Sequence, residues 1–288
     1  QPIGLRLLDQ SRHDAGPFVL RHPGVDARIG NHLGIAFGQR HEDEHAEAIR
    51  TIRAALSDMG DPTVLFACPT CRHMFETYLP EVKGAFVYEH LGAPSAAPAR
   101  STVSVFDPCQ SRAYPDMQAQ VRALLKGAGV ALSPLPNEGG RALCCGFGGQ
   151  GAIANPKFAK EVAKKRIGQS EHPYVTYCAN CRDTFVHEGK ESFHLFDVLW
   201  GLNGGDRPAP TQTARRKNRE ALFASLCESE GVQVQEKSEA GARVSIPEAL
   251  LQPMSDEWML EDEVKSVVRL CEESGKKLFD RATNTYIG

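Results

Sequence analysis

Cysteine is the residue type whose spacing in this sequence most clearly indicates chemistry. Five of the nine cysteines form one pattern between residues 109 and 181: a single cysteine, an adjacent pair followed by glycine, and a Cys-x-x-Cys motif. These are Cys109, Cys144, Cys145, Cys178 and Cys181. Thiolates are soft ligands that suit zinc and iron–sulfur clusters. The pattern therefore predicts a metal or cluster site built from these five side chains.

Two features of the pattern favour an iron–sulfur cluster over zinc. The side chains of Cys144 and Cys145 diverge from one backbone step, so a cluster with several irons accommodates both more easily than a single tetrahedral ion does. Five thiolates also exceed the four ligands of a closed zinc site. A disulfide framework is typical of small secreted chains and does not suit a chain of 288 residues.

The same residues resemble the cysteine-rich CCG domain found in heterodisulfide reductases (in their HdrB component) and in related iron–sulfur oxidoreductase subunits. The resemblance covers about residues 25–200 and rests on Cys109, the Cys144-Cys145-Gly146 triplet and Cys178-Ala-Asn-Cys181. It implies that the five cysteines hold a noncubane [4Fe–4S] cluster, and that such motifs occur in tandem. It also implies a multisubunit redox complex with flavin- and ferredoxin-type partner subunits.

The role of the chain in such a complex stays open between two hypotheses. In the first, it relays electrons or reduces a disulfide-type substrate, as the resemblance implies, with relay favoured because only one cysteine motif is complete. In the second, it is a zinc-stabilised, non-catalytic scaffold subunit. A brown protein would support the first hypothesis, and a colourless protein with stoichiometric zinc would support the second.

A second cysteine pair belongs to an incomplete internal repeat. Shifting the chain by 110 residues superposes Cys68 and Cys71 on Cys178 and Cys181, and also Phe75 on Phe185. No cysteine matches Cys109, and His32 falls near the position of Cys144. We therefore expect Cys68 and Cys71 to be either relics of the repeat, or ligands of a second cluster or of zinc, with His32 as the best further ligand. Other candidates are His13, His22, His41 and His73.

Apolar patterns predict the elements that position the cysteines. Short apolar runs at 63–67, 103–106 and 174–177 predict strands that end just before Cys68, Cys109 and Cys178. Helical spacing predicts helices over residues 42–59, after Pro115, after the N-cap Asn155, and over residues 261–274. The apolar face predicted for the helix after Asn155 consists of Phe158, Val162, Ala163 and Ile167.

Strands that alternate with helices predict a parallel α/β sheet, in which ligands gather at the carboxyl ends of the strands. We expect an α/β fold with two pseudo-repeated CCG-type subdomains and a C-terminal helical tail. Residues 1–100 form the degenerate first repeat, residues 101–204 the complete second repeat, and residues 205–288 a tail that packs on the body or docks a partner. In that tail, Cys227 and Cys271 are predicted to be helix-packing residues.

Further polar residues and glycines lie close to the cysteines in the sequence. The glycines after Cys145 predict a loop whose N–H groups donate hydrogen bonds to sulfur. No Gly-x-Gly-x-x-Gly motif follows a predicted strand, so the sequence gives no case for a bound nucleotide cofactor. Several side chains that could deliver protons are expected to be solvated instead: Asp107, Asn180, Arg182, His187 and His194.

Composition places the chain among ordinary globular proteins. It is 41% hydrophobic and 24% charged, with a net charge of −3. That charge gives no support for nucleic acid or an anionic membrane as partner, and no apolar run reaches the about 18 residues of a membrane span. Nine cysteines without a secretory signal predict a cytoplasmic protein, and we expect a hetero-oligomer. The start at Gln1 indicates a processed end or a piece of a longer chain.

Overall fold

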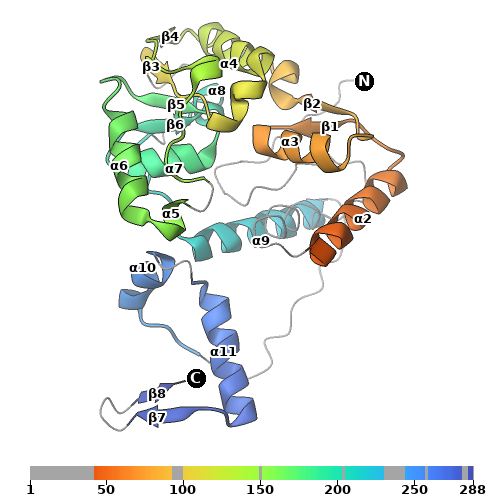
Figure 1. The fold of residues 1–288 in the computed structure, drawn as a ribbon, viewed down its shortest axis with the longest axis vertical. Helices are drawn as coiled ribbons and strands as arrows, with labels where there is room; N and C mark the ends of the chain where they lie inside the picture. Colours follow the sequence, from red (N-terminus) through yellow and green to blue (C-terminus); the bar gives the residue numbers. More distant parts are fainter. Residues whose placement is uncertain are drawn as a thin grey trace. The chain divides into compact units, whose positions relative to one another are not determined.

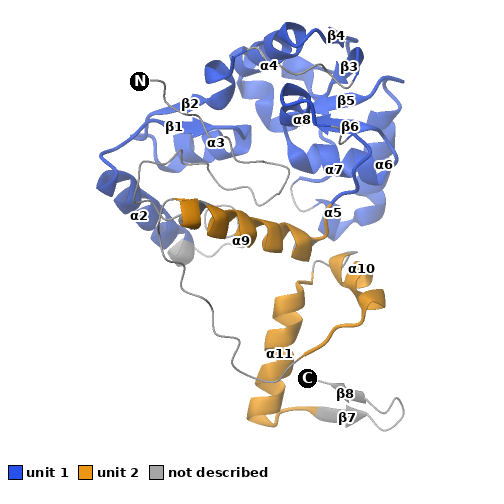
Figure 2. Cartoon of the chain, turned by 180° about the vertical axis from the view of Figure 1, so that it is seen from behind, with its two compact units in different colours: residues 1–209 blue, residues 210–288 orange. Residues whose placement is uncertain are grey.

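The computed structural model describes residues 42–92, 100–148, 151–202, 205–229, 244–256, 259–280 and 285–287. The chain divides into two compact units, residues 1–209 and residues 210–288 (Figure 2). The five cysteines of the main pattern and the Cys68–Cys71 pair all lie in the first unit. In the described part of the chain, no helix combines the length and the apolar character that crossing a bilayer requires.

A four-stranded parallel sheet is the centre of the second half of the first unit. Its strand order is β4 (Ala131–Leu132), β3 (Thr102–Val105), β5 (Tyr174–Thr176) and β6 (Ser192–His194). Ser104 lies opposite Tyr174, and Val175 lies opposite Phe193. Because β3 and β5 are parallel neighbours, they end at the same edge of the sheet, and Cys109 and Cys178 follow them there.

The sheet is buried on both faces, as is usual for parallel strands. On one face Val105 and Val175 share a core with α4 (Pro115–Gly127) and α8 (Leu195–Leu199). On the other face Phe106 and Tyr174 share a core with Cys145, Cys181 and α7 (Ala179–His187). In Figure 1, α4 lies beside β3 and β4, and α6 (Pro156–Ile167) and α7 lie below β5 and β6. Successive side chains of β5 therefore point into two different cores. Cysteines of the main pattern line the core that contains Tyr174.

Helix α6 begins as the sequence predicts, and one of the four residues predicted for its apolar face is exposed. Asn155 caps it by accepting a hydrogen bond from the Phe158 N–H at 3.0 Å. The prediction that Phe158 faces the interior is wrong, because its side chain is 61% exposed. The buried residues of the helix are Ala159 and Ala163. Small side chains let α6 approach the loop that carries Cys144 and Cys145, and a phenylalanine on that face would hold the two segments apart.

The first half of this unit repeats the order found around Cys178. Strand β1 (Val64–Phe66) leads to Cys68 and α3 (Pro69–Tyr78), followed by β2 (Gly84–Phe86) and the 3₁₀ helix η2 (Val87–His90). Strands β1 and β2 are parallel, as β5 and β6 are. Cys68 and Cys178 both cap their helices in extended conformations, with φ, ψ of −119°, 122° and −134°, 115°. The predicted α/β fold with pseudo-repeated subdomains is confirmed.

The two halves share a core although each has its own sheet. Side chains from α2 (Glu42–Asp58), β1 and α3 lie in the same buried cluster as side chains from β3, α4 and α8. The rings of Tyr88 and Tyr177 meet edge to face at 6.0 Å, and those of Phe86 and Tyr114 at 5.0 Å. The repeats therefore stabilise each other through a common apolar interior.

The second unit is built mainly from helices. It contains α9 (Gln212–Ser229), α10 (Glu248–Asp256), α11 (Glu261–Ser274) and a hairpin of β7 (Leu278–Asp280) and β8 (Thr285–Ile287). The side chain of Lys217 lies 3.2 Å from Glu261, which joins α9 to α11. Helix α11 ends at Gly275 with φ of 67°, as the sequence predicts. Cys271 is half-buried on this helix, and the side chain of Cys227 lies outside the described residues.

Candidate metal centre

Three segments deliver the five cysteines of the main pattern to one edge of the four-stranded sheet. Cys109 follows β3 and opens the 3₁₀ helix η3 (Cys109–Ala113). Cys178 follows β5 and caps α7, and Cys181 lies in the first turn of that helix. Cys144 and Cys145 lie on the loop between the 3₁₀ helix η4 (Gly139–Arg141) and α5 (Gly151–Ala154). The geometry follows from the parallel pairing of β3 with β5, which places both strand ends together.

The five thiols form one continuous row of hydrogen-bonded neighbours. Cys109 and Cys145 both contact Cys144, Cys145 also contacts Cys181, and Cys181 contacts Cys178. Cys145 and Cys181 are buried, and the other three are half-buried. Among the described residues, no three or more His, Cys, Asp or Glu side chains are grouped as ligands around a single ion. The arrangement is thus a row of sulfurs along the strand ends.

Hydrogen bonding concentrates negative charge on Cys144, the second sulfur of the row. The Cys109 thiol, then the Cys145 thiol, donate to Cys144 and lower its pKa to about 2, with help from the N–H groups of Gly146 and Gly148. The N–H of Gly146 lies 3.3 Å from the sulfur. Donation to Cys144 raises the pKa of Cys145 to about 12 and raises that of Cys109 well above its ordinary value. Cys144 is the favoured thiolate of the row.

The loop after Cys145 depends on glycine at its first position. Gly146 has φ of +103°, a conformation that side chains disfavour, and a Cβ atom there would lie 2.6 Å from the carbonyl oxygen of Ala159. Arg166 of α6 donates from Nε to the carbonyl oxygen of Cys144 at 3.2 Å. Helix α6 therefore packs directly on the paired cysteines and holds their backbone from outside the row.

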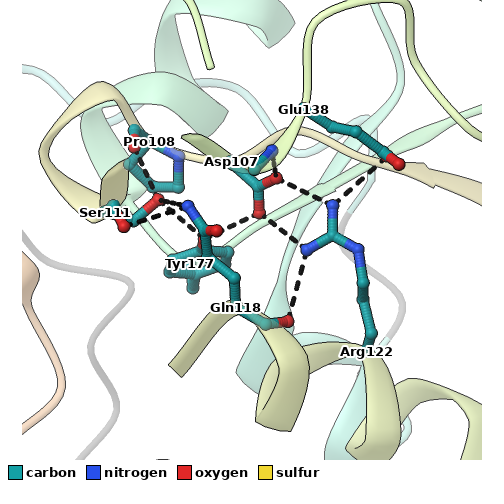
Figure 3. A network of polar contacts seen from close by, with 8 residues as sticks. Asp107, Pro108, Ser111, Gln118, Arg122, Glu138 and Tyr177 are labelled. Atoms are coloured by element: carbon teal, nitrogen blue, oxygen red, sulfur yellow. Dashed lines mark hydrogen bonds and ion pairs between the residues drawn. The ribbon is translucent and has the colours of Figure 1, made fainter. Parts of the chain in front are cut away.

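A buried carboxylate ties the three cysteine-bearing segments together (Figure 3). Asp107, two residues before Cys109, accepts from the Tyr177 hydroxyl at 2.7 Å and from the Gly139 N–H at 2.6 Å. Arg122 of α4 donates two hydrogen bonds to the same carboxylate, at 3.0 and 2.7 Å. Tyr177 directly precedes Cys178, and Gly139 starts the segment that leads to Cys144. Asp107 therefore fixes the relative positions of all three segments.

Neighbouring polar groups complete this network. Burial, followed by the charge of Asp107, raises the pKa of Tyr177 well above its ordinary value, so its hydroxyl keeps its proton for Asp107. The Ser111 hydroxyl donates to the Pro108 carbonyl at 2.7 Å and lies 2.9 Å from the Tyr177 oxygen. Gln118 donates to the backbone oxygen of Ser111 at 2.9 Å. These contacts hold the turn that carries Cys109.

The expectation that polar residues near the cysteines are solvated is wrong at three positions. Asp107, Arg182 and His194 are each 2% exposed. Arg182 donates to Asp183 at 2.8 Å, and His194 accepts at Nδ1 from the N–H of Phe196. His187 is exposed and Asn180 is half-buried. The buried groups satisfy hydrogen bonds within the fold, which is what burying a charge or dipole requires.

The structure brings Cys68 and Cys71 together but does not describe their predicted third ligand. The thiol of Cys71 donates to the sulfur of Cys68, and this bond lowers the pKa of Cys68 to about 7. The charge of Cys68 is also close enough to Cys178 to raise the pKa of that thiol. His32, His13, His22 and His41 lie outside the described residues, and His73 is exposed on α3. Metal binding at this pair stays a prediction.

Sequence reasoning missed the residues that position the ligands. Nothing in their spacing singles out Arg122, Glu138 or Tyr177, because their partners lie 15, 16 and 70 residues away in the chain. Asp107 could have been recognised from the sequence, because it stands between a predicted buried strand and the Pro108-Cys109 turn. A carboxylate at the end of a buried strand must find donors.

The donor set suits a cluster with several metal centres. The row consists of sulfur ligands alone, includes two adjacent residues, and has buried apolar side chains such as Phe106, Phe185 and Leu135 beside it. Soft thiolate donors in a dry setting are the usual ligands of iron–sulfur clusters. Fold and site together define a cysteine-rich α/β domain whose donor set suits a metal centre.

Comparison with known proteins agrees with this class. Residues 103–185 match the family model of the CCG cysteine-rich domain, a segment that runs from β3 into α7 and contains all five cysteines. The resemblance noted from the sequence is thereby confirmed for this segment. Such domains are common in iron–sulfur oxidoreductase subunits of multisubunit redox complexes. The search of curated proteins found no match for the chain.

Proposed function

We propose that this chain is an HdrB-like component, of the heterodisulfide reductase type, in a multisubunit redox complex. In this proposal Cys109, Cys144, Cys145, Cys178 and Cys181 hold one noncubane [4Fe–4S] cluster. The observation that carries it is the continuous row of five thiols, which come from three separate segments. A bound cluster of this kind would supply one-electron redox chemistry.

The surroundings of the row support a positioning and tuning role for the protein. The N–H groups of Gly146 and Gly148 donate to Cys144, and hydrogen bonds to ligand sulfur raise the potential at which a cluster accepts electrons. The hydrogen bonds of Asp107 hold the three ligand segments together, and these bonds do not go to the sulfurs. The chain's residues thus bind, orient and partly desolvate the cluster.

Electron relay is the role that we favour for this site. The first half of the unit offers two cysteines, Cys68 and Cys71, where the second half offers five. A substrate held between two equivalent clusters would need a complete motif in each half. With one complete motif, the chain is better suited to pass electrons between flavin- or ferredoxin-type partner subunits.

Metal analysis of anaerobically purified protein tests the assignment. We expect about four irons per chain, a brown colour and an EPR signal on reduction or oxidation. The Cys145→Ser variant should lose most of the iron, because its sulfur occupies the middle of the row and contacts both Cys144 and Cys181. The matched control is Cys271→Ser on α11, which should keep the full iron content.

Two results would overturn the proposal. Colourless wild-type protein with stoichiometric zinc would replace it with a zinc-stabilised scaffold. Equal iron loss from both serine variants would show that the row is not the ligand set. Circular dichroism on each variant separates loss of ligand from loss of fold.

A further inference from the structure

Cys68 and Cys71 form a thiol pair outside the row of five. Cys68 caps α3 and is half-buried, whereas Cys71 lies in the first turn of the helix and is buried. Their sulfurs are hydrogen-bonded to each other. A Cys-x-x-Cys motif at a helix start, with its two sulfurs hydrogen-bonded to each other, has the arrangement of a thiol–disulfide redox pair. The intervening residues, Pro69 and Thr70, start the helix and fix the turn between the sulfurs.

Within the first unit, residues 1–209, every cysteine other than Cys68 and Cys71 belongs to the row of five. Cys71 packs in the core shared by the two halves, whereas Cys145 and Cys181 pack in the other core. The hydrogen bonds of Cys68 and Cys71 stay within their own turn, including those to Thr70, while those of Cys178 and Cys181 continue into the row.

Packing holds the pair beside the end of the row. Tyr88 is fully buried and donates its hydroxyl proton to the carbonyl oxygen of Ala67, the residue before Cys68. Its ring meets that of Tyr177, the residue before Cys178, at 6.0 Å. The charge of Cys178 raises the pKa of Cys71, and the charge of Cys68 raises that of Cys178. The two aromatic rings therefore fix the two Cys-x-x-Cys turns next to each other.

We propose that Cys68 and Cys71 are a redox-active dithiol that reversibly closes to a disulfide, a thiol–disulfide exchange site separate from the cluster ligands. In the reaction, the Cys68 sulfur attacks a disulfide RSSR, forms a mixed disulfide and releases one RSH. The Cys71 sulfur then attacks Cys68, closes the Cys68–Cys71 bond and releases the second RSH. Two electrons and two protons pass from the dithiol to the substrate disulfide, and a dithiol reductant reverses the step.

The order of attack follows from position in the helix. Cys68 is the half-buried N-cap residue, whereas Cys71 lies buried inside the first turn and is placed to resolve the mixed disulfide. A relic would not close to a disulfide reversibly, and in a metal site both sulfurs would be masked together, so the experiment below separates the three cases. The inference does not depend on iron being bound at the row.

The test uses the full chain, purified anaerobically and equilibrated with glutathione and glutathione disulfide at graded ratios. Acid quenching, denaturation and alkylation are followed by trypsin digestion and mass spectrometry. Cys68 and Cys71 fall together on the tryptic peptide of residues 54–72, and Cys178 and Cys181 on that of residues 167–182. We expect the first peptide to change from doubly alkylated to unalkylated and lighter by two hydrogen atoms as the ratio becomes oxidising. Added dithiothreitol should reverse the change.

Two single variants test the direction of the exchange. In Cys71→Ser, the mixed disulfide with glutathione should accumulate on Cys68 because its resolving thiol is missing. In Cys68→Ser, glutathione addition to the buried Cys71 should be at least about tenfold less. The wild-type measurement needs no variant, so a variant that fails to fold leaves the test intact.

Two outcomes would overturn the inference. Both sulfurs could stay free under oxidising ratios, or they could be masked by a stoichiometric metal that is lost in Cys68→Ser. Iron content and visible absorption, recorded on the same samples, report on the row separately. Protein without iron that still closes the Cys68–Cys71 bond would refute the cluster assignment and leave this inference standing.

Discussion

Asp107 is the residue on which the arrangement of the ligand segments depends most. Its side chain is fully buried and is satisfied by Tyr177, Gly139 and Arg122. Asp107→Asn keeps the shape but removes the charge and replaces an acceptor oxygen with a donor that faces other donors. We expect the free energy of unfolding in urea to fall by about 3 kcal/mol, the range for breaking a buried ion pair from one side.

Glu138→Gln is the matched control for this prediction. Glu138 contacts the same guanidinium at 3.2 Å, but its side chain is 35% exposed. Solvent therefore screens this contact, and the loss should stay below about 1 kcal/mol. Equal losses in the two variants would show that the buried carboxylate has no special structural role.

Glu76 links α3 to the segment after η3 and makes stability depend on pH. Burial alone would raise its pKa, but hydrogen bonds from Arg72 at 2.7 Å and from the Tyr114 hydroxyl at 2.6 Å outweigh burial and lower the pKa below 4.5. A carboxylate with a depressed pKa in the folded state stabilises the fold above its unfolded pKa. That stabilisation is lost as the pH falls through the folded pKa.

The wild type should therefore be more stable than Glu76→Gln near neutral pH, by less than about 1 kcal/mol because the Glu76 side chain is 46% exposed. The difference should disappear in urea titrations on going from about pH 6 to about pH 3. A difference that stayed constant over this range would mean that the charge of Glu76 contributes nothing.

At the residue scale, the sequence predicted which cysteines come together but not what holds them. Thiolate ligands are rare and their spacing is recognisable, so Cys109, Cys144, Cys145, Cys178 and Cys181 could be grouped without a structure. The partners of Asp107 are ordinary residue types whose meeting depends on packing between α4, β5 and η4. The assignment of His32 as a ligand shows a further limit of the sequence, because the position of a single histidine says little about what it binds.

At the scale of elements, the turn after Cys145 is the most constrained part of the site. Gly146→Ala would place a Cβ atom 2.6 Å from a backbone oxygen of α6, at a φ of +103°. Either the turn or the helix must then move, and we expect a loss of about 2–4 kcal/mol in urea unfolding. The iron content should fall in parallel, because Cys144 and Cys145 share this turn.

Gly148→Ala is the control in the same loop. A Cβ atom at Gly148 meets no atom within 4 Å, and the substitution keeps the backbone N–H that donates to Cys144. Its effect on stability should stay within about 0.5 kcal/mol. If both alanine variants behaved alike, close packing between the turn and α6 would not be what fixes the paired cysteines.

Element types were largely predictable because the apolar patterns are strong. The strands before Cys68, Cys109 and Cys178 form at β1, β3 and β5, and the helix predicted over residues 261–274 forms as α11. Phe158 was assigned to the wrong face because hydrophobicity alone cannot show how closely two segments approach. Where α6 meets a glycine turn, side-chain volume decides the buried face, and the smaller Ala159 and Ala163 occupy it.

At the scale of the molecule, the internal repeat was visible in the sequence, but the joining of its two copies was not. The offset of 110 residues rests on Cys68, Cys71 and Phe75, all of which have structural counterparts in the second copy. Contacts between the copies, such as Tyr88 with Tyr177, involve residues that differ from one copy to the other. Sequence self-similarity reports equivalent positions, and those are not the positions that pack against each other.

Because the copies share one core, damage in the first should loosen the second. Phe75 is 2% exposed and meets Phe66 edge to face at 5.0 Å. Phe75→Ala should lower the free energy of unfolding by about 4 kcal/mol through lost burial and the cavity that remains. Native-state hydrogen exchange should then become faster at Val175 and Phe193 of the four-stranded sheet as well as in β1. The reason is that all of these strands contribute to the common core and open with it.

The control is Thr77→Ala, on the exposed side of α3, which should leave exchange in both sheets unchanged. Faster exchange confined to residues 64–90 in Phe75→Ala would show that the copies unfold independently. The degenerate first repeat would then be a separate module. Coupled exchange would give that repeat a physical reason to persist without its full cysteine set: its apolar side chains complete the interior on which the ligand-bearing strands rest.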